Sequence, residues 1–386
     1  MRQDRVLFLN HSSELGGGEL SLLEYLAGRP DNKAVVLFQD GPLLDQLRKH
    51  DIPVEILAGM DGVLTMKRSS GLGDSIRAAL GGLGSIDRLA RRMRWADMVY
   101  TNSQKATVIG AVAAMIARRP MIWHLHDIMT SPGFSGTARK VAIALTNRAA
   151  KLVIANSQAT ADAYRQIGGN KPITVIPNGI DPGKFQDQDR RHNHLRLAEE
   201  LGIGNQPILG LFGRISPWKG QDVAIRALAD IPDAHLVLVG GALFGQQDLL
   251  EQLKSQAVAA GLADRVHFLG FRRDIPELLS SVDIALHCST EAEPFGRVIV
   301  EAMMAGTPVI VTRGGGATEI VTQTQSDLMV PPHDPEALAA AVNSLLENPD
   351  LTLAHARSIQ AKAIELYDIA KVNRKIDDAI VSLSVG

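Results

Sequence analysis

The stretch of residues 284–311, IALHCSTEAEPFGRVIVEAMMAGTPVIV, decides the fold of this chain. Its apolar run 284–287 has the length of a strand, and a helical stretch begins near Gly296 and ends near Gly306. A second apolar run follows at 309–311. Short apolar runs that alternate with helices are typical of parallel strands buried on both faces. The stretch therefore predicts one strand–helix–strand repeat of an α/β sheet.

The same alternation extends over the whole chain in both directions. Strand-length apolar runs occur in the first half at 6–10, 34–38, 54–57, 98–100, 121–124, 152–155 and 173–176. In the second half they occur at 208–212, 236–239, 266–269, 284–287, 309–311 and 328–330. We therefore expect an α/β protein made of two doubly wound, Rossmann-like domains.

The chain of 386 residues is also too long for one ordinary core, because single cores stop growing at roughly 250–300 residues. Turn-forming residues at 177–183, PNGIDPG, end a strand and mark the best domain boundary. We predict a first domain at 1–179 and a second at 180–367. A last helical segment, about 368–386, is expected to pack back on the first domain.

Bulk composition excludes several classes of protein. Hydrophobic residues make up 45% and charged residues 21%, as in globular proteins, and no apolar run approaches the roughly 20 residues of a membrane span. The first residues, MRQDR, lead directly into a strand-like run, and Cys288 is the only cysteine. We expect a cytoplasmic protein without disulfides and without a nucleic-acid partner.

Charge divides unevenly along the chain. Residues 1–180 hold 22 Lys and Arg against 15 Asp and Glu, whereas residues 181–386 hold 18 against 27. Much of the excess lies at 67–94, where Lys67, Arg68 and five further arginines accompany apolar residues at helical spacing. This pattern fits a peripheral contact with an anionic membrane, and it fits equally a core-facing helix with a solvated basic face.

Two carboxylates lie in the segment 293–301, EPFGRVIVE, directly after a predicted strand. Glu293 lies before the expected helix and Glu301 about one and a half turns inside it. Carboxylates accept hydrogen bonds from vicinal hydroxyl pairs, such as those of a sugar or a ribose, and a helix N-terminus attracts anions. A capping and a solvated glutamate would be the structural alternative, which the entry through Pro294 and Gly296 disfavours.

Two cations lie five residues apart in the loop 213–220, GRISPWKG, after the first strand of the second half. Arg214 can bind phosphate oxygens in a bidentate manner, and Lys219 supplies a point charge. The loop suits a diphosphate, although an ordinary surface loop is an equal alternative from these residues alone. It lacks the spacing of a P-loop.

Three glycines, at 16–18, follow the first strand. Gly16 and Gly17 permit a close approach of backbone to a ligand at a helix start, and the structural alternative is a plain strand-to-helix turn. The Gly-x-Gly-x-x-Gly pattern is absent, which argues against a dinucleotide-binding oxidoreductase.

His124 and His126 lie two residues apart at a strand end, WHLHD, so both side chains point to one face. No third ligand that would make them a metal pair is evident nearby, and which histidine faces a site stays open. Asp187 and Asp189 form an Asp-x-Asp triplet, which we interpret as solvated linker rather than a metal site.

Taken together, these motifs resemble the large retaining glycosyltransferase family 4, which has the GT-B fold of two Rossmann-like domains facing a central cleft. The resemblance covers essentially the whole chain. The segment 293–301 matches the family's Glu-x-Phe-Gly-x-x-x-x-Glu pattern in full. The loop 213–220 matches its diphosphate loop, 177–181 its interdomain linker, and Gly16 with Gly17 its first glycine loop.

The resemblance implies a role for each matching position. Arg214 and Lys219 would bind the donor diphosphate, and Glu301 the ribose hydroxyls. The transferred sugar would contact Glu293 and the backbone of Phe295 and Gly296. His126 would lie near the reacting sugar, and Gly17 near the donor phosphates. The nucleobase would lie against the loop around Phe271 and Arg272.

The implied reaction transfers a hexose from a UDP- or GDP-sugar to a glycan or lipid-linked acceptor, with retention and without a metal or other cofactor. Synthesis of cell-envelope or exopolysaccharide is the expected setting. A nucleotide-sugar epimerase, a phosphorylase of the same fold and a non-catalytic nucleotide-sugar binder are the alternatives.

Overall fold

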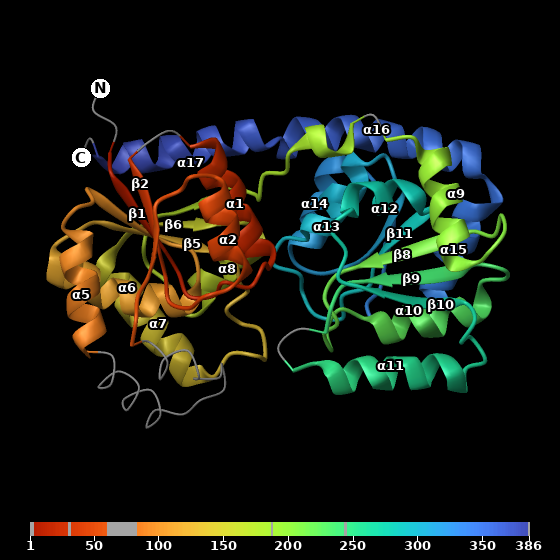
Figure 1. Cartoon of the computed structure of the whole chain (residues 1–386), viewed down its shortest axis with the longest axis horizontal. Helices are drawn as coiled ribbons and strands as arrows, with labels where there is room; N and C mark the ends of the chain where they lie inside the picture. Colours follow the sequence, from red (N-terminus) through yellow and green to blue (C-terminus); the bar gives the residue numbers. More distant parts are fainter. Residues whose placement is uncertain (1–3, 30–31, 60–82, 187, 243–244, 385–386) are drawn as a thin grey trace. The chain divides into compact units, whose positions relative to one another are not determined.

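The computed structural model describes residues 4–29, 32–59, 83–186, 188–242 and 245–384 of the chain. These residues divide into two compact units (Figure 1). Unit 1 comprises Met1–Gly179 with Ile369–Gly386, and unit 2 comprises Ile180–Asp368. Each unit has one parallel sheet with helices on both faces, so the predicted fold class of two doubly wound α/β domains is confirmed.

The sheet of unit 1 has the strand order β3-β2-β1-β4-β5-β6-β7, and all neighbouring strands are parallel. Its strands are β1 (Val6–Asn10), β2 (Lys33–Leu37), β3 (Val54–Ile56), β4 (Met98–Thr101), β5 (Met121–Leu125), β6 (Ala150–Ala155) and β7 (Ile173–Val175). The order changes direction between β1 and β4. In open parallel sheets, ligands bind beyond the carboxyl ends of the strands at such a point.

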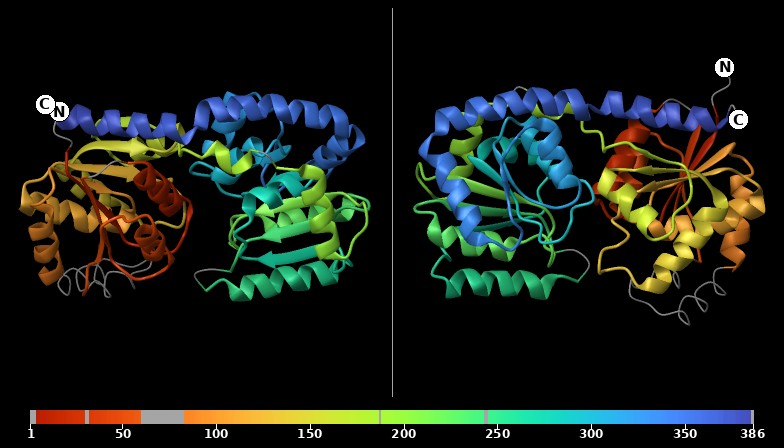
Figure 2. Two further views of the ribbon diagram at one scale, coloured as in Figure 1. Left: turned by 45° about the horizontal axis from the view of Figure 1, so that its top comes forward. Right: turned by 180° about the vertical axis from the view of Figure 1, so that it is seen from behind.

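Helices cover both faces of this sheet. One face packs against α1 (Gly17–Gly28), α2 (Pro42–Lys49) and α17 (Ile369–Ser384), which Figure 2 shows lying along unit 1. The other face packs against α5 (Leu83–Met93), α6 (Gln104–Ala117), α7 (Gly136–Ala149) and α8 (Gln158–Gln166). The last helix of the chain therefore completes the core of unit 1 rather than that of unit 2.

The sheet of unit 2 has the order β10-β9-β8-β11-β12-β13, again with parallel neighbours. Its strands are β8 (Ile208–Phe212), β9 (His235–Val239), β10 (Val266–Gly270), β11 (Ile284–His287), β12 (Val309–Thr312) and β13 (Met329–Val330). Alternate residues of β8 enter different cores, because Ile208 and Phe212 pack on one face and Leu209 and Leu211 on the other. A continuous apolar run results.

The two helical layers of unit 2 are visible in Figure 1 on either side of its sheet. One layer holds α9 (Arg190–Leu201), α12 (Ile275–Ser281), α13 (Arg297–Met304), α14 (Gly316–Thr324) and α16 (Pro349–Tyr367). The other holds α10 (Gln221–Ala227), α11 (Gln247–Ala259) and α15 (Pro335–Glu347).

The thirteen predicted strands are all present, with ends that differ from the predicted ones by at most two residues. The last helix, expected at about 368–386, begins at Ile369 and ends at Ser384. Among the described helices, none combines the length and the apolar content that crossing a membrane requires.

Candidate active site

Two loops of unit 2 meet at the carboxyl edge of its sheet. The loop 213–220 follows β8 and the loop 288–296 follows β11, and these two strands are hydrogen-bonded neighbours. Gly220, which caps α10, has a φ of +68°. A Cβ there would lie 1.9 Å from the carbonyl oxygen of Cys288, so glycine lets the two loops touch.

This contact brings Lys219 and Glu293 together. The Lys219 Nζ atom lies 2.7 Å from Glu293 Oε2, and the two side chains are only 18% and 10% exposed. The ammonium also lies 4.1 Å from the centre of the Trp218 ring, a cation–π contact. The structure therefore places two of the predicted site residues in one shielded ion pair.

Two further residues bind the same carboxylate oxygen. His287 Nε2, at the end of β11, lies 3.1 Å from Glu293 Oε2, and Ser289 Oγ donates to it at 3.0 Å. Within the described part of the chain, the other oxygen of Glu293, Oε1, accepts no hydrogen bond and keeps contact with solvent. One oxygen is thus anchored while the other is available to a ligand.

The surroundings of Glu293 keep it ionised. Burial alone would raise the pKa of this carboxyl, but the charge of Lys219 and the hydrogen bond and charge of His287 together hold that pKa well below its ordinary value. An ionised carboxylate is an acceptor on both oxygens, as a sugar hydroxyl requires.

Glu301 lies inside α13, in the same segment. Its Oε1 atom is 3.2 Å from Arg297 Nη2, one turn earlier on the helix, and both side chains are largely buried. Gly296 caps the helix with a φ of +104°, and a Cβ there would meet Ile299 Cδ1 at 2.7 Å. The side chain of Phe295 is buried in the core of unit 2, so only its backbone can serve a ligand.

Arg214, the other predicted phosphate ligand, is exposed in the loop after β8. Its backbone carbonyl accepts a hydrogen bond of 3.0 Å from Gln221 Nε2, which ties the loop to α10. Gly240 closes the loop from the β9 side, because a Cβ there would lie 2.1 Å from the carbonyl oxygen of Gly213. The loop backbone is therefore fixed, and the Arg214 residue itself is exposed.

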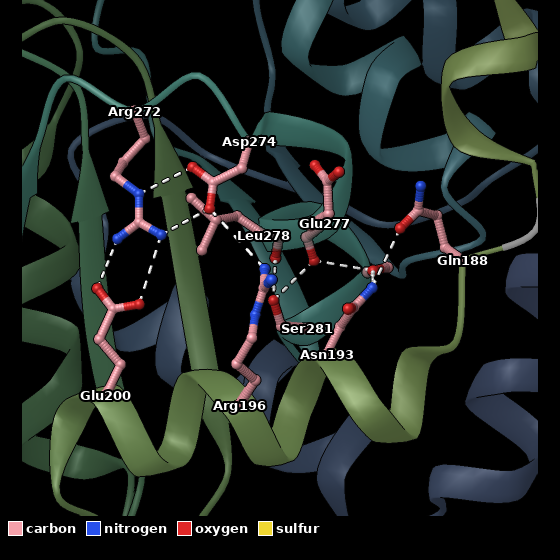
Figure 3. A network of polar contacts seen from close by, with 10 residues as sticks. Gln188, Asn193, Arg196, Glu200, Arg272, Asp274, Glu277, Leu278 and Ser281 are labelled. Atoms are coloured by element: carbon pink, nitrogen blue, oxygen red, sulfur yellow. Dashed lines mark hydrogen bonds and ion pairs between the residues drawn. The ribbon is translucent and has the colours of Figure 1, made fainter.

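The loop predicted to contact the nucleobase, around Phe271 and Arg272, forms ion pairs that do not involve the Glu293 cluster. Figure 3 shows Arg272 between Asp274 and Glu200, with N–O distances of 2.8 and 2.5 Å. These hydrogen bonds raise the pKa of the Arg272 guanidinium above its ordinary value. The partners of Arg272 are thus carboxylates of α9 and of the α12 entry rather than the Glu293 cluster. Phe271 beside it is 64% exposed and offers an open aromatic face.

In unit 1, polar side chains follow three adjacent strands. Asn10 ends β1, Asn102 follows β4, and His126 follows β5. His126 Nε2 lies 2.9 Å from Asn102 Oδ1. Asn10 contacts Glu19 Oε1 at 3.1 Å. The His126 ring lies against α1, since a Cβ added at Gly18 would be 3.4 Å from it.

The predicted glycine loop opens α1, with Gly16 as its cap and Gly17 as its first residue. A Cβ at Gly16 would approach Glu19 Oε2 to 2.8 Å. Burial raises the pKa of Glu19, and the hydrogen bond from Asn10 opposes that rise. The loop therefore combines a helix N-terminus with a half-buried glutamate.

The two histidines of β5 and its end differ in exposure. His124 is buried, lies 2.6 Å from the Tyr100 hydroxyl through Nδ1, and its pKa is far below the ordinary value because of burial and the nearby His126. His126 is half-buried at the strand end. Their ring centres are 3.9 Å apart, as expected for side chains on one face. Of the two, His126 is the one that a ligand can reach.

Asp187 and Asp189 form the Asp-x-Asp triplet that the sequence analysis considered as a metal site. Asp187 lies outside the described residues, and Asp189 caps α9 by accepting a hydrogen bond of 3.0 Å from the His192 backbone. Among the described residues, no group of three or more His, Cys, Asp or Glu side chains could hold a metal ion.

The basic segment 67–94 is described only from residue 83 onward. In α5, Leu89 and Met93 are buried in the core of unit 1. Arg91 pairs with Asp87, and Arg92 with Glu55 at 2.7 Å. The apolar face of this described part is thus used inside unit 1, which agrees with the core-facing alternative.

Comparison with known proteins identifies the family. The profile of Glycosyl transferases group 1 matches residues 195–364, and that of Glycosyltransferase Family 4 matches residues 42–184. The crystal structure of HepE from Anabaena in complex with UDP and glucose has 39% sequence identity and a TM-score of 0.89, over 98% of this chain and 100% of that chain. The chain therefore belongs to glycosyltransferase family 4, with the GT-B fold.

Two further relatives are also glycosyltransferases. A D-inositol 3-phosphate glycosyltransferase of Acidothermus cellulolyticus is 29% identical over 342 residues, which cover 85% of this chain and 71% of that protein. A GDP-mannose-dependent alpha-(1-6)-phosphatidylinositol monomannoside mannosyltransferase of Mycolicibacterium smegmatis is 33% identical over 195 residues, 47% of this chain and 49% of that protein. As a member of this family, the chain is a glycosyltransferase and therefore an enzyme.

Sequence reasoning missed several residues of these clusters. His287 and Ser289 bind Glu293, Arg297 binds Glu301, and Asn102 binds His126. Their signal was weak but present, because all except Arg297 lie at or just after the carboxyl end of a strand next to the switch in strand order.

Proposed function

We propose that this glycosyltransferase transfers a hexose from a UDP-sugar, with UDP-glucose as the first candidate, and that the anomeric configuration is retained. The observation that carries the proposal is the asymmetric environment of Glu293, whose Oε2 is bound by three side chains while Oε1 accepts no hydrogen bond within the described residues. Such a carboxylate suits a sugar hydroxyl. The UDP-glucose complex of HepE, at 39% identity, supports the choice of donor.

Stabilising the leaving nucleoside diphosphate is the main catalytic task. When the bond between the anomeric carbon and the diphosphate breaks and a bond to the acceptor oxygen forms, negative charge develops on phosphate. Lys219 still has two N–H donors beyond its bond to Glu293, and Arg214 is exposed in the loop after β8. Together with helix N-termini, these cations would stabilise that charge without a metal.

Glu301 would bind the ribose hydroxyls, and Arg297 holds it in place. The nucleobase would lie against Phe271, whose exposed ring can stack on it. The site of unit 2 would thus bind the donor, with the sugar at Glu293 and the nucleoside beyond Glu301. Unit 1 would serve the acceptor, and His126 would act near the reacting sugar as the family resemblance implies.

The test is a donor screen followed by product analysis. We expect UDP-glucose to raise the melting temperature more than UDP-GlcNAc or GDP-mannose, and turnover to release UDP with a new glycosidic bond of retained configuration by NMR. Turnover in EDTA should equal turnover with Mg²⁺. Failure to bind or hydrolyse any UDP-, GDP- or ADP-sugar would refute the donor proposal. An epimerised sugar without UDP release would favour an epimerase, and sugar phosphate as product would favour a phosphorylase.

The acceptor that we propose is a glycan or a lipid-linked glycan in polysaccharide synthesis. We also propose a contact with an anionic membrane, which the positive net charge of unit 1 supports. The residues that would carry it, Lys67 and Arg68, lie outside the described residues. Flotation with anionic liposomes at low salt should recover the protein, and replacing both residues with Glu should abolish recovery. Replacing Lys151 and Lys254 with Glu is the charge-matched control. Absence of flotation at low salt would refute membrane contact.

A further inference from the structure

A chain of directional hydrogen bonds in unit 1 ends at His126. The bonds run between the ends of three adjacent strands, β1, β4 and β5. An asparagine amide can be placed in two orientations, which exchange its donor nitrogen and its acceptor oxygen. A partner that can only donate or only accept shows which orientation is correct. Backbone carbonyl groups supply such partners here, because a carbonyl oxygen only accepts.

The orientation of Asn10 is fixed first. Its Nδ2 atom lies 2.7 Å from the backbone carbonyl oxygen of Ser12 and 3.1 Å from Glu19 Oε1. A reversed amide would place its own oxygen against the Ser12 carbonyl, with no hydrogen between two acceptors. The Oδ1 atom of Asn10 is therefore the acceptor that faces Asn102.

The orientation of Asn102 follows. Its Nδ2 atom donates to the Gly18 carbonyl oxygen at 3.1 Å and to Asn10 Oδ1 at 3.3 Å. Both amide hydrogens are then used, and reversal would set oxygen against the Gly18 carbonyl. Asn102 Oδ1 must therefore face His126 Nε2, from which it lies 2.9 Å.

We infer that Asn102 is a positioning residue that holds His126 as the tautomer with its proton on Nε2. An acceptor at 2.9 Å requires a donor on the other side, so Nε2 carries hydrogen and Nδ1 is the basic nitrogen of the neutral ring. The ring also packs against Gly18 and His124, which limits its rotation. Nδ1 is buried in the ligand-free structure, so a proton that His126 accepts during turnover would reach Nδ1 only after the surroundings of the ring open.

The inference rests on the proposed function only for its catalytic consequence, since the tautomer is a property of the ligand-free protein. The first test is ¹⁵N NMR of the full chain with labelled histidine, at a pH where imidazoles are neutral. His126→Asn identifies the signals of His126 among those of the 11 histidines by their loss. We expect the shift pattern of the Nε2–H tautomer, and the Nδ1–H pattern in the wild-type protein would overturn the inference.

The second test changes Asn102. Asn102→Asp keeps an acceptor for His126 and should keep the Nε2–H tautomer, whereas Asn102→Leu should give a mixture. Asn193→Leu, which removes a buried asparagine of unit 2, is the control and should leave the His126 signals unchanged. An unchanged tautomer in folded Asn102→Leu would overturn the positioning role, and if that variant does not fold, the wild-type spectrum still decides the tautomer.

Turnover then separates this inference from the proposed function. Asn102→Leu should lower kcat about tenfold, the effect of one lost hydrogen bond, with little change in KM for the donor. If His126→Asn turns over like wild type while the Nε2–H tautomer is observed, the proposed role of His126 fails and the positioning by Asn102 stands.

Discussion

Lys219 Nζ lies 2.7 Å from Glu293 Oε2, and both side chains are largely buried. The residue proposed for the diphosphate is thus positioned by the residue proposed for the sugar. Because the ammonium is already paired, the loop after β8 and the loop after β11 are held in place before a donor arrives. Such preorganisation lowers the cost of arranging charges during the reaction.

Lys219→Ala should abolish turnover and destabilise unit 2. It removes the phosphate ligand and leaves Glu293 as a buried charge without its ammonium partner, for which a loss of about 3–5 kcal/mol is typical. Steady-state UDP release and thermal unfolding measure the two effects. Lys254→Ala is the matched control, because it breaks a Lys–Glu pair on the surface, where pairs contribute about 0–1 kcal/mol. Unchanged turnover in Lys219→Ala would refute its role.

The stability that Glu293 contributes should depend on pH. Its pKa is lowered in the folded protein relative to the ordinary value of 4.5, so its contribution is fully present above that value and is lost as pH falls toward the folded pKa. Wild type should exceed Glu293→Gln in melting temperature most at about pH 7 and less at about pH 3.5. A difference between the two that stays constant over this range would contradict the lowered pKa.

The fold could be predicted from sequence because its signal is local. A strand buried on both faces is apolar at every position, as in Ile208–Phe212, and a turn interrupts the pattern at each end. Strand ends were harder to predict, since Lys33 and His235 are polar residues at the amino ends of β2 and β9. Hydrogen bonding between strands extends into such residues although their side chains leave the core.

The candidate site was predictable only where residue type and spacing carry the chemistry. Glu293 and Lys219 belong to motifs, but their contact requires β8 and β11 to be neighbours, which no spacing states. The sequence indicates only that His287 ends a strand, whereas the structure shows that its ring turns back to Glu293. Asn102 was marked only by its place after β4, because its contact with His126 depends on the direction of hydrogen bonds in three dimensions.

The roles of Glu301 and Glu293 should be distinguishable by comparing the binding of UDP with that of UDP-glucose. Glu301→Gln should weaken binding of both UDP and UDP-glucose by about ten- to a hundredfold, because hydrogen bonds to a charged group contribute about 1.5–3 kcal/mol. Glu293→Gln should weaken binding of UDP less than Glu301→Gln does, because UDP has no sugar at that position and the Gln oxygen can still accept from Lys219, and it should lower turnover of UDP-glucose. Isothermal titration with each ligand measures this.

The control for that comparison is Glu336→Gln, which changes an exposed glutamate in the first turn of α15 and should alter neither affinity. Equal losses of UDP affinity in Glu301→Gln and Glu293→Gln would contradict the division of the two carboxylates between ribose and sugar.

Gly220→Ala should destabilise the protein far more than Gly202→Ala, although both glycines have a φ of +68°. The left-handed backbone conformation costs any alanine about 1 kcal/mol, and this cost is common to both variants. At Gly202 a Cβ meets no atom within 4 Å, whereas at Gly220 it would lie 1.9 Å from the Cys288 carbonyl oxygen. Relieving that overlap must separate the loops that carry Lys219 and Glu293. Gly220→Ala should therefore lose turnover at temperatures where it is still folded, while Gly202→Ala keeps it, and equal melting temperatures and activities in the two variants would show that the loops need no such close contact.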